Sequence, residues 1–289
     1  MAADLRQLCF CVLLINLSLL SLALAQDENQ FIYNGFKGSN LRLDEAAKIL
    51  PNGLLQLTNI TDLKSGYGFH PIPIKFNTSS SRSLYFSTNF VFSMVPEAEN
   101  FGGDGIAFVF SPSLDFSGSI AGAYLGLLNA TRNGQSTNHI LAIELDAIET
   151  NEFNDIDGNH VGIDVNSMIS NDSATAAYFS NGEGKNKSLV LANGDPIQMW
   201  IDYSGAEMLL NATLAPITVP KPSRPLLSTS INLSEIFLDT MYVGFSAATG
   251  LRRSDHYVLG WSFNITGQAQ DLDISKLLQL PHAGKQVRT

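Results

Sequence analysis

The chain has 289 residues, of which 45% are hydrophobic and 15% charged, with a formal net charge of -10. This acidic balance, without a basic stripe, argues against nucleic acid or anionic membrane surfaces as partners. The length is enough for one sizeable core, and sandwiches or barrels of this size are commonly single domains.

Residues 1–25 form a separate segment. A short N-terminal region precedes an apolar run that ends in the small-residue sequence ALA, which is typical of a signal-peptide cleavage site. We therefore expect a signal peptide over 1–25, a secreted mature chain that begins near Gln26, and no transmembrane segment beyond the signal. The two cysteines, Cys9 and Cys11, both lie in the signal, so the mature chain must fold without disulfides.

Sequences of the form Asn-X-Ser/Thr recur through the mature chain, as expected for a glycoprotein of the secretory route. The eight candidate acceptors are Asn59, Asn77, Asn129, Asn171, Asn186, Asn211, Asn232 and Asn264.

Short runs rich in Val, Ile, Phe and Tyr alternate with Gly, Asn, Pro and Ser clusters from residue 31 onward, which predicts an all-β fold. No helical stripe extends beyond the turn at 233–237, and no βαβ alternation is present, so we expect a sandwich of two antiparallel sheets. One domain should cover 26–267, followed by a C-terminal tail over 268–289. The clearest predicted strands are 84–95, 105–111, 140–145, 160–165, 198–203, 207–214, 241–247 and 257–263.

The segment 140–166 carries the densest group of acidic side chains. Strand periodicity places Glu144 and Asp146 on one face, and His160 opens a second strand-like run. If the two strands pair, His160 returns to the two carboxylates. Such close like charges repel unless a cation neutralises them, so the segment predicts a metal-binding hairpin. The connecting loop adds Glu149, Glu152, Asp155 and Asp157 to this group of charges. The alternative is that the acidic loop is a solvated surface.

Four segments together resemble the legume (L-type) lectin family over nearly all of the mature chain, and most closely the extracellular lectin domains of plant lectin receptor kinases. They are the hairpin, GGDGIAF at 102–108, YLGL at 124–127, and VGFSAATG at 243–250 leading to LGWSF at 259–263. The resemblance implies a concanavalin-like jelly-roll sandwich that binds sugar through loops on its curved sheet. With the signal peptide, we expect an extracellular location in the apoplast, or at the cell surface if the chain is part of a longer receptor. A carbohydrate or glycoconjugate is the expected ligand, and a homodimer is one candidate assembly.

A transition metal, usually Mn²⁺, is the first ion that the resemblance implies. Carboxylate oxygens with one imidazole suit such an ion, whereas Ca²⁺ takes oxygen ligands only. The matching residues are Glu144, Asp146, Asp155 and His160, with Ser170 reaching the ion through water.

A neighbouring Ca²⁺ is the second implied ion. It would share Asp146 and Asp155 with the first ion and take the carbonyl of Ile148. The family's asparagine ligand falls at Thr150 in this sequence, and a shift of one residue would let Asn151 replace it.

Asp104 is the implied sugar-binding carboxylate. It follows two glycines and precedes a buried strand, and the resemblance implies a cis peptide between Gly103 and Asp104. Its carboxylate would accept hydrogen bonds from two sugar hydroxyls, helped by the backbone amide near Ala123 and by Asn151.

The remaining sugar contacts depart from the family pattern. The aromatic ring on which a sugar stacks corresponds to Ile148, and the specificity loop corresponds to 251–256, which begins with Leu251 and Arg252. The sequence therefore predicts a lectin that binds simple sugars weakly.

Two other functions remain open at this stage. Glu144 and Glu149 fit the ExDxxE pattern of retaining sandwich-fold hydrolases that resemble family-16 glucanases, as nucleophile and acid/base respectively. The chain also fits a ligand-sensing ectodomain of a receptor kinase with little sugar binding. The acidic hairpin favours metal-dependent sugar binding over hydrolysis, because hydrolysis needs neither His160 nor Asp155.

Overall fold

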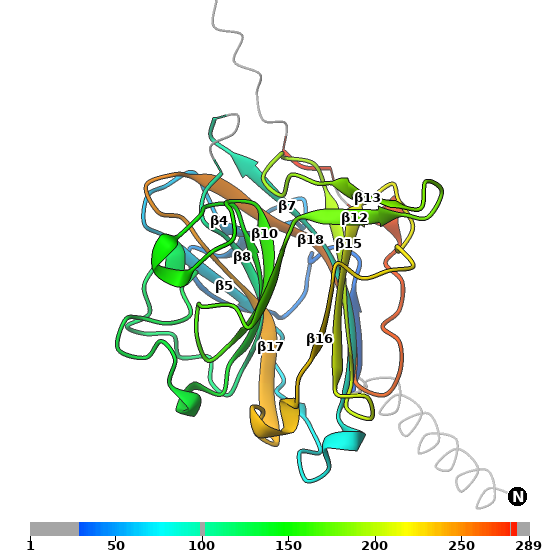
Figure 1. Cartoon of the computed structure of the whole chain (residues 1–289). Coiled ribbons are helices and arrows are strands. Elements are labelled where there is room, and N and C mark those ends of the chain that lie inside the picture. Colours follow the sequence, from blue (N-terminus) through cyan, green and yellow to red (C-terminus); the bar gives the residue numbers. More distant parts are fainter. Residues whose placement is uncertain (1–28, 99–101, 278, 282–289) are drawn as a thin grey trace, which may run out of the picture.

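The computed structural model describes residues 29–98, 102–277 and 279–281. Within these ranges the chain forms two eight-stranded antiparallel sheets and contains no α-helix. This confirms the predicted all-β sandwich. Figure 1 looks between the two layers, with β17 on one side and β16 on the other.

The back sheet has the strand order β16-β15-β14-β7-β18-β4-β3, with β1 paired to β18. Its strands are β1 (Gln30–Tyr33), β3 (Lys48–Ile49), β4 (Leu55–Thr58), β7 (Tyr85–Pro96), β14 (Ile197–Ser204), β15 (Leu209–Pro216), β16 (Leu227–Ser230) and β18 (Ser254–Asn264).

The front sheet has the order β11-β10-β9-β8-β17-β5-β2, with β6 paired to β17. Its strands are β2 (Arg42–Glu45), β5 (Ser65–Phe69), β6 (Ile74–Lys75), β8 (Gly105–Ser111), β9 (Leu141–Asp146), β10 (His160–Val165), β11 (Asp172–Thr175) and β17 (Thr240–Ala248).

A third, two-stranded sheet of β12 (Ala177–Ser180) and β13 (Lys185–Ser188) lies across one end of the sandwich (Figure 1). Short 3₁₀ turns occupy the loops: η1 (Ser81–Ser83), η2 (Gly122–Tyr124), η3 (Ser136–Asn138), η4 (Asn151–Phe153), η5 (Leu233–Glu235) and η6 (Ile274–Lys276). None of the described helical segments has the length and apolar character needed to cross a bilayer.

The main core lies between the two sheets. Alternation along β9 sends Leu141, Ile143 and Leu145 into this core, so Glu144 and Asp146 project from the opposite, outer face of the front sheet. Aromatic side chains dominate the interior, where Phe108, Phe245 and Trp261 contact one another edge to face. The strand pattern thus turns the acidic residues toward the loops.

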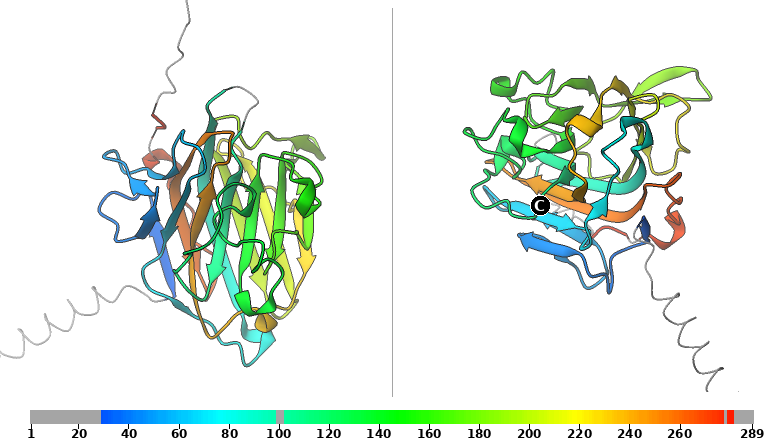
Figure 2. Two further views of the ribbon diagram at one scale, coloured as in Figure 1. Left: turned by 90° about the vertical axis from the view of Figure 1, so that its left-hand side faces the viewer. Right: turned by 90° about the horizontal axis from the view of Figure 1, so that it is seen from below.

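A second apolar cluster covers the outer face of the front sheet. Phe116, Leu127, Phe153 and Met168 come from loops and pack on strand residues such as Ala142. These loops lie over the sheet in the left view of Figure 2. The covering loops enclose the acidic side chains at the β9–β10 end and hold them away from bulk water.

The chain after β18 packs on the back sheet. Leu272 and Leu277 contact an apolar group that includes Val91 and Leu259 on its outer face. Two cavities of about 380 Å³ each flank this segment and share Ile274 in their linings.

Two buried histidines predict acid sensitivity of the fold. His70 stacks on Phe31 and contacts the Tyr33 hydroxyl, and His256 contacts Thr58 Oγ1. Burial lowers the pKa of His70 to about 4 and that of His256 to about 3. The unfolded chain takes up these protons near pH 6.5. The contribution of the two neutral histidines to the free energy of unfolding is therefore complete above pH 6.5. It is lost as the pH falls toward 4, and each histidine loses about 1.4 kcal/mol for each pH unit.

Urea unfolding between pH 7 and pH 4 measures this loss. The His256→Asn variant, which keeps a side-chain donor near Thr58 Oγ1, should show a shallower fall in the free energy of unfolding. A flat profile for the unchanged protein over the same range would contradict the assignment.

Candidate functional site

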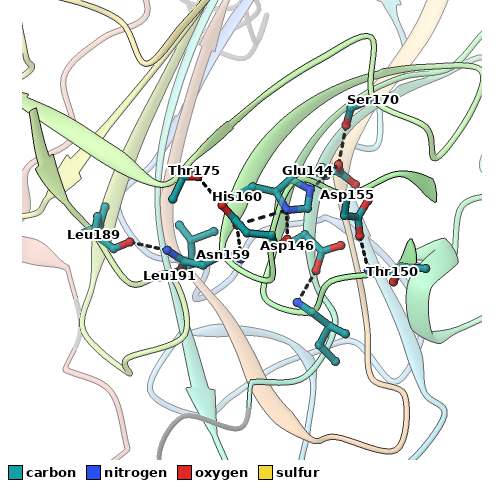
Figure 3. A network of polar contacts seen from close by, with 12 residues as sticks. Glu144, Asp146, Thr150, Asp155, Asn159, His160, Ser170, Thr175, Leu189 and Leu191 are labelled. Atoms are coloured by element: carbon teal, nitrogen blue, oxygen red, sulfur yellow. Dashed lines mark hydrogen bonds and ion pairs between the residues drawn. The ribbon is translucent and has the colours of Figure 1, made fainter. Parts of the chain in front are cut away.

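The acidic side chains of β9 meet the histidine of β10 at the end of the front sheet. In the antiparallel register His160 lies opposite Asp146, and Gly162 lies opposite Glu144. Ligand atoms of Glu144, Asp146 and His160 lie within 4.8 Å of one another, and these residues are 2%, 4% and 1% exposed. The predicted return of His160 to the two carboxylates is confirmed (Figure 3).

The imidazole orientation suits a ligand. His160 Nδ1 lies 2.7 Å from the carbonyl oxygen of Asp157, to which it donates, and Nε2 faces Glu144 Oε1 at 3.2 Å. Burial alone would lower the pKa of His160, but the hydrogen bond and charge of Glu144, with the charge of Asp146, raise it to about 9. Nε2 is thus the ring atom that a cation would contact in place of a proton.

The carboxylates are costly to keep together. Burial and the charge of Glu144 raise the pKa of Asp146 well above its usual range. Asp155 lies outside the closest group, yet burial raises its pKa too, and it interacts electrostatically with both Glu144 and His160. A bound cation would neutralise the repulsion between these carboxylates. Carboxylate oxygens together with one imidazole fit a divalent cation of the manganese type.

Ser170 and Asp164 complete this cluster on the side of β10. The Ser170 hydroxyl lies 2.7 Å from Glu144 Oε1 and 2.7 Å from Asp164 Oδ1. Burial raises the pKa of Asp164 well above its usual range. A side chain at Gly162 would place its Cβ 2.2 Å from Ser170 Oγ and 2.3 Å from Glu144 Oε1. Only glycine fits there.

Sequence reasoning assigned no role to Asp164 or Gly162. Alternation from His160 along the predicted strand 160–165 places both residues on the face that bears the ligands, and this signal could have found them.

Asp104 stands beside the cluster at the start of β8. Its carbonyl accepts the N–H of Ala147 at 2.8 Å, one residue from Asp146. The side chain is 5% exposed, and its Oδ2 atom has no hydrogen-bond partner. Burial raises the pKa of Asp104 to about 6, which backbone amides of Asp104 and Gly250 and the charge of Arg252 offset only in part.

Glycines surround this carboxylate. A Cβ at Gly250 would lie 2.9 Å from Asp104 Oδ2, and one at Gly122 would lie 3.7 Å from Oδ1. Gly122 precedes Ala123 in η2, and Gly250 precedes Leu251 in the β17–β18 loop, where Leu251 is 82% exposed. The structure therefore brings the two loops that sequence reasoning selected, around Ala123 and around Leu251, to Asp104.

The backbone before Asp104 is fixed by a residue that the sequence did not single out. The N–H of Gly103 donates to Ser254 Oγ at 2.6 Å, and Thr58 Oγ1 donates to the Ser254 carbonyl at 3.3 Å. The implied cis peptide between Gly103 and Asp104 is wrong for this structure, whose described residues contain no cis bond. A cis bond before a residue other than proline costs about 2.5–4 kcal/mol.

The residues after β9 hold the acidic loop by backbone contacts. Ile148 N–H donates to Asp146 Oδ1 at 2.7 Å, and Thr150 N–H donates to Asp155 Oδ2 at 2.6 Å. Thr150 precedes η4, and Asn151, the first residue of η4, is exposed. The choice between Thr150 and Asn151 as a Ca²⁺ ligand remains a prediction.

The candidate glycan acceptors differ in exposure. Asn264 is 7% exposed, and its amide donates to Gln30 Oε1 and to the Gln268 carbonyl. This sequon is a poor acceptor in the folded domain, because a glycan on that nitrogen would displace the contacts. Asn129, Asn211 and Asn232 are half-buried, and the exposed acceptors are Asn59, Asn77, Asn171 and Asn186.

Comparison with known proteins matches this chain and its fold to one family. The profile described as "Legume lectin domain" matches residues 28–279. Among similar curated proteins from Arabidopsis thaliana, "Probable inactive L-type lectin-domain containing receptor kinase III.1" is 52% identical over 258 residues, covering 89% of this chain and 41% of that protein. "L-type lectin-domain containing receptor kinase I.8" is 51% identical over 272 residues, which cover 94% of this chain and 40% of that protein. The chain thus spans about two fifths of these relatives.

Solved structures show the same architecture. A lectin from Bauhinia forficata in complex with GalNAc is 25% identical with a TM-score of 0.68, over 81% of this chain and 96% of that one. Lectin I from Ulex europaeus, in complex with the methyl glycoside of alpha-L-fucose, is 27% identical with a TM-score of 0.68 over the same shares.

Proposed function

Because the chain belongs to the legume lectin domain family, we propose that it binds carbohydrate at Asp104, at a site that depends on bound Mn²⁺ and Ca²⁺. One observation carries the proposal. Asp104 keeps a buried carboxylate oxygen without a partner, directly beside the Glu144, Asp146 and His160 cluster. A buried unsatisfied acceptor is costly, and two sugar hydroxyls would satisfy it.

Different residues would bind the cations and the sugar. Glu144, Asp146, Asp155 and His160 are the proposed Mn²⁺ ligands; Asp146 and Asp155 would also bind Ca²⁺. Bound cations would supply positive charge that neutralises these carboxylates and fixes the loop after β9. Ser170, Ile148, Thr150 and Asn151 are the remaining proposed contributors to the two ion sites.

Asp104 would accept hydrogen bonds from adjacent sugar hydroxyls. Gly122 and Gly250 put no side chain beside the two carboxylate oxygens, so a sugar would approach Asp104 from this side, where the Ala123 amide, Leu251 and Arg252 would border it. Two hydroxyl donors on one ionised carboxylate select a pair of neighbouring hydroxyls, which is a carbohydrate feature.

The similar receptor kinases favour a second description of the same domain. They are receptor kinases that carry an L-type lectin domain, so we propose an extracellular or cell-surface location, and a sensing role if a kinase forms part of the same protein. In that role the ligand could engage the exposed loops with little contribution from Asp104.

Hydrolysis is the least favoured function. The proposed nucleophile Glu144 is 2% exposed and is engaged by His160 and Ser170, whereas Glu149 is exposed on the loop. A retaining hydrolase needs both carboxyls open to one glycosidic bond. We therefore propose binding without catalysis.

Two departures from the family pattern predict weak binding of monosaccharides. Ile148 offers no ring for stacking, which is worth about 0.5–1.5 kcal/mol, and Thr150 offers no bridging amide, worth about 1 kcal/mol. The Ile148→Phe and Thr150→Asn double variant should bind monosaccharides about 10 to 100 times more tightly at fixed Ca²⁺. Calorimetric titration measures the gain. Equal affinity for the two proteins would mean that another group, such as Asn151, already supplies these contacts.

A further inference from the structure

Asp164 holds an unusual position next to the proposed metal centre. It lies two residues after Gly162 on β10 and projects from the ligand-bearing face of the front sheet. The side chain is 2% exposed. One carboxyl oxygen, Oδ1, lies 2.7 Å from the Ser170 hydroxyl, and the other, Oδ2, has no hydrogen-bond partner.

The Ser170 hydroxyl links Asp164 to a proposed ligand. The same oxygen lies 2.7 Å from Glu144 Oε1, and this contact is drawn in Figure 3. Ser170 and Glu144 fill the space over Gly162 that any larger residue would occupy. Asp164 also interacts with Glu144 itself, because, beyond burial, the charge and the side-chain hydrogen bond of Glu144 both raise the pKa of Asp164. Asp164, Ser170 and Glu144 therefore form one connected group.

The position of Asp164 does not stabilise the fold. A carboxyl group with an unsatisfied buried oxygen costs free energy, and no Lys or Arg contact accompanies the described bond to Ser170. Asp202 offers the contrast on the back sheet. It contacts the Ser87 hydroxyl at the same 2.7 Å, but Lys221 pairs with it at 2.7 Å.

We propose that Asp164 is a positioning residue of the metal centre, which holds the Ser170 hydroxyl and through it fixes the Glu144 carboxylate in the orientation that binds the cation. This inference rests on the proposed function. Glu144 is a flexible side chain, and a partner that restricts a ligand typically improves metal affinity 10–100-fold. Asp164 itself contacts neither the cation nor the sugar.

The test measures Mn²⁺ binding by calorimetry on chelator-treated protein. Asp164→Ala should weaken Mn²⁺ binding about 10–100-fold. Asp164→Asn has the same size and can still bond to Ser170, so it should lose less than about tenfold. Ser170→Ala breaks the same link and also removes the proposed water-mediated contact of Ser170 with the cation, so it should weaken Mn²⁺ binding at least as much as Asp164→Ala; it also serves if Asp164→Ala fails to fold. Asp202→Ala, the matched control, should bind Mn²⁺ as the unchanged protein does.

Three outcomes would overturn the inference. If Asp164→Ala or Ser170→Ala keeps full Mn²⁺ affinity while Glu144→Gln loses it, the metal centre stands and the role of Asp164 does not. If Asp164→Asn is as weak as Asp164→Ala, charge rather than the contact to Ser170 is what matters. If the unchanged protein binds no Mn²⁺, the proposed metal centre fails and this inference fails with it.

Discussion

Replacing Asp146 with Asn is expected to abolish binding of both Mn²⁺ and Ca²⁺, because Asp146 is the proposed ligand common to the two ions. A cation present at about 100 times its Kd stabilises the fold by about 2.7 kcal/mol. Each kcal/mol corresponds to roughly 2–4 °C of Tm in a domain of this size. The variant should therefore lose the metal-dependent part of Tm, about 5–10 °C, in a calorimetric scan with both ions present.

The Tm of the Asp146→Asn variant should not fall when a chelator removes the cations. Without a cation, the carboxylate of Asp146 lies buried beside Glu144 and raises the free energy of the fold. Asparagine removes that charge and keeps the acceptor for the Ile148 N–H, so the Tm in chelator should stay unchanged or rise. Glu149→Gln is the control, because Glu149 is exposed and outside the cluster. A fall in Tm for Asp146→Asn in chelator alone would show a structural role without metal.

Replacing Asp104 with Asn is expected to remove most of the sugar affinity. Two hydrogen bonds to an ionised carboxylate are worth about 1.5–3 kcal/mol each, and an amide can accept both only weakly. The loss should reach at least about 100-fold in Kd. Metal binding should not change, because Asp104 contacts the cluster through its backbone carbonyl and Ala147.

Stability gives this prediction an internal check. Asp104 carries a buried oxygen without a partner, and burial raises the pKa of the carboxyl, so Asp104→Asn should be at least as stable as the unchanged protein. Asp202→Asn on the back sheet is the matched control and should bind sugar normally. If Asp104→Asn binds a glycan as tightly as the unchanged protein, the ligand is held elsewhere, and the sensing role through other loops gains support.

The sequence predicted the strands well where apolar periodicity was uninterrupted. The expected strands 105–111 and 160–165 agree with β8 and β10. The return of His160 to the two carboxylates was expected if its strand paired with the one before it, and the antiparallel register of β9 and β10 confirms it. The short edge strands were not predicted, because β2, with the sequence RLDE, is held by pairing to β5 rather than by its own apolar pattern.

The charged residues of the site could be predicted from the sequence, but the contacts that position them could not. Glu144, Asp146 and His160 stand out as acidic or metal-binding side chains at strand spacing. Ser254 acts through a contact with Gly103, which is far away in the chain, and no local pattern reveals it. Strand alternation places Asp164 on the ligand-bearing face, but its contact with Ser170 depends on how the loop after β10 folds back. The buried state of Asn264 likewise depends on Gln268, after the strand has ended, and the sequon alone gives no sign of it.

The central claim is that sugar binding needs both the metal cluster and Asp104. A glycan array probed with the chelator-treated protein, and again after Mn²⁺ and Ca²⁺ are restored, tests it most directly, with Asp104→Asn measured alongside. The account predicts that glycans bind the metal-restored protein only, and that Asp104→Asn binds none of them in either condition. Retention of the same glycans in chelator, or by Asp104→Asn with both ions present, would contradict it.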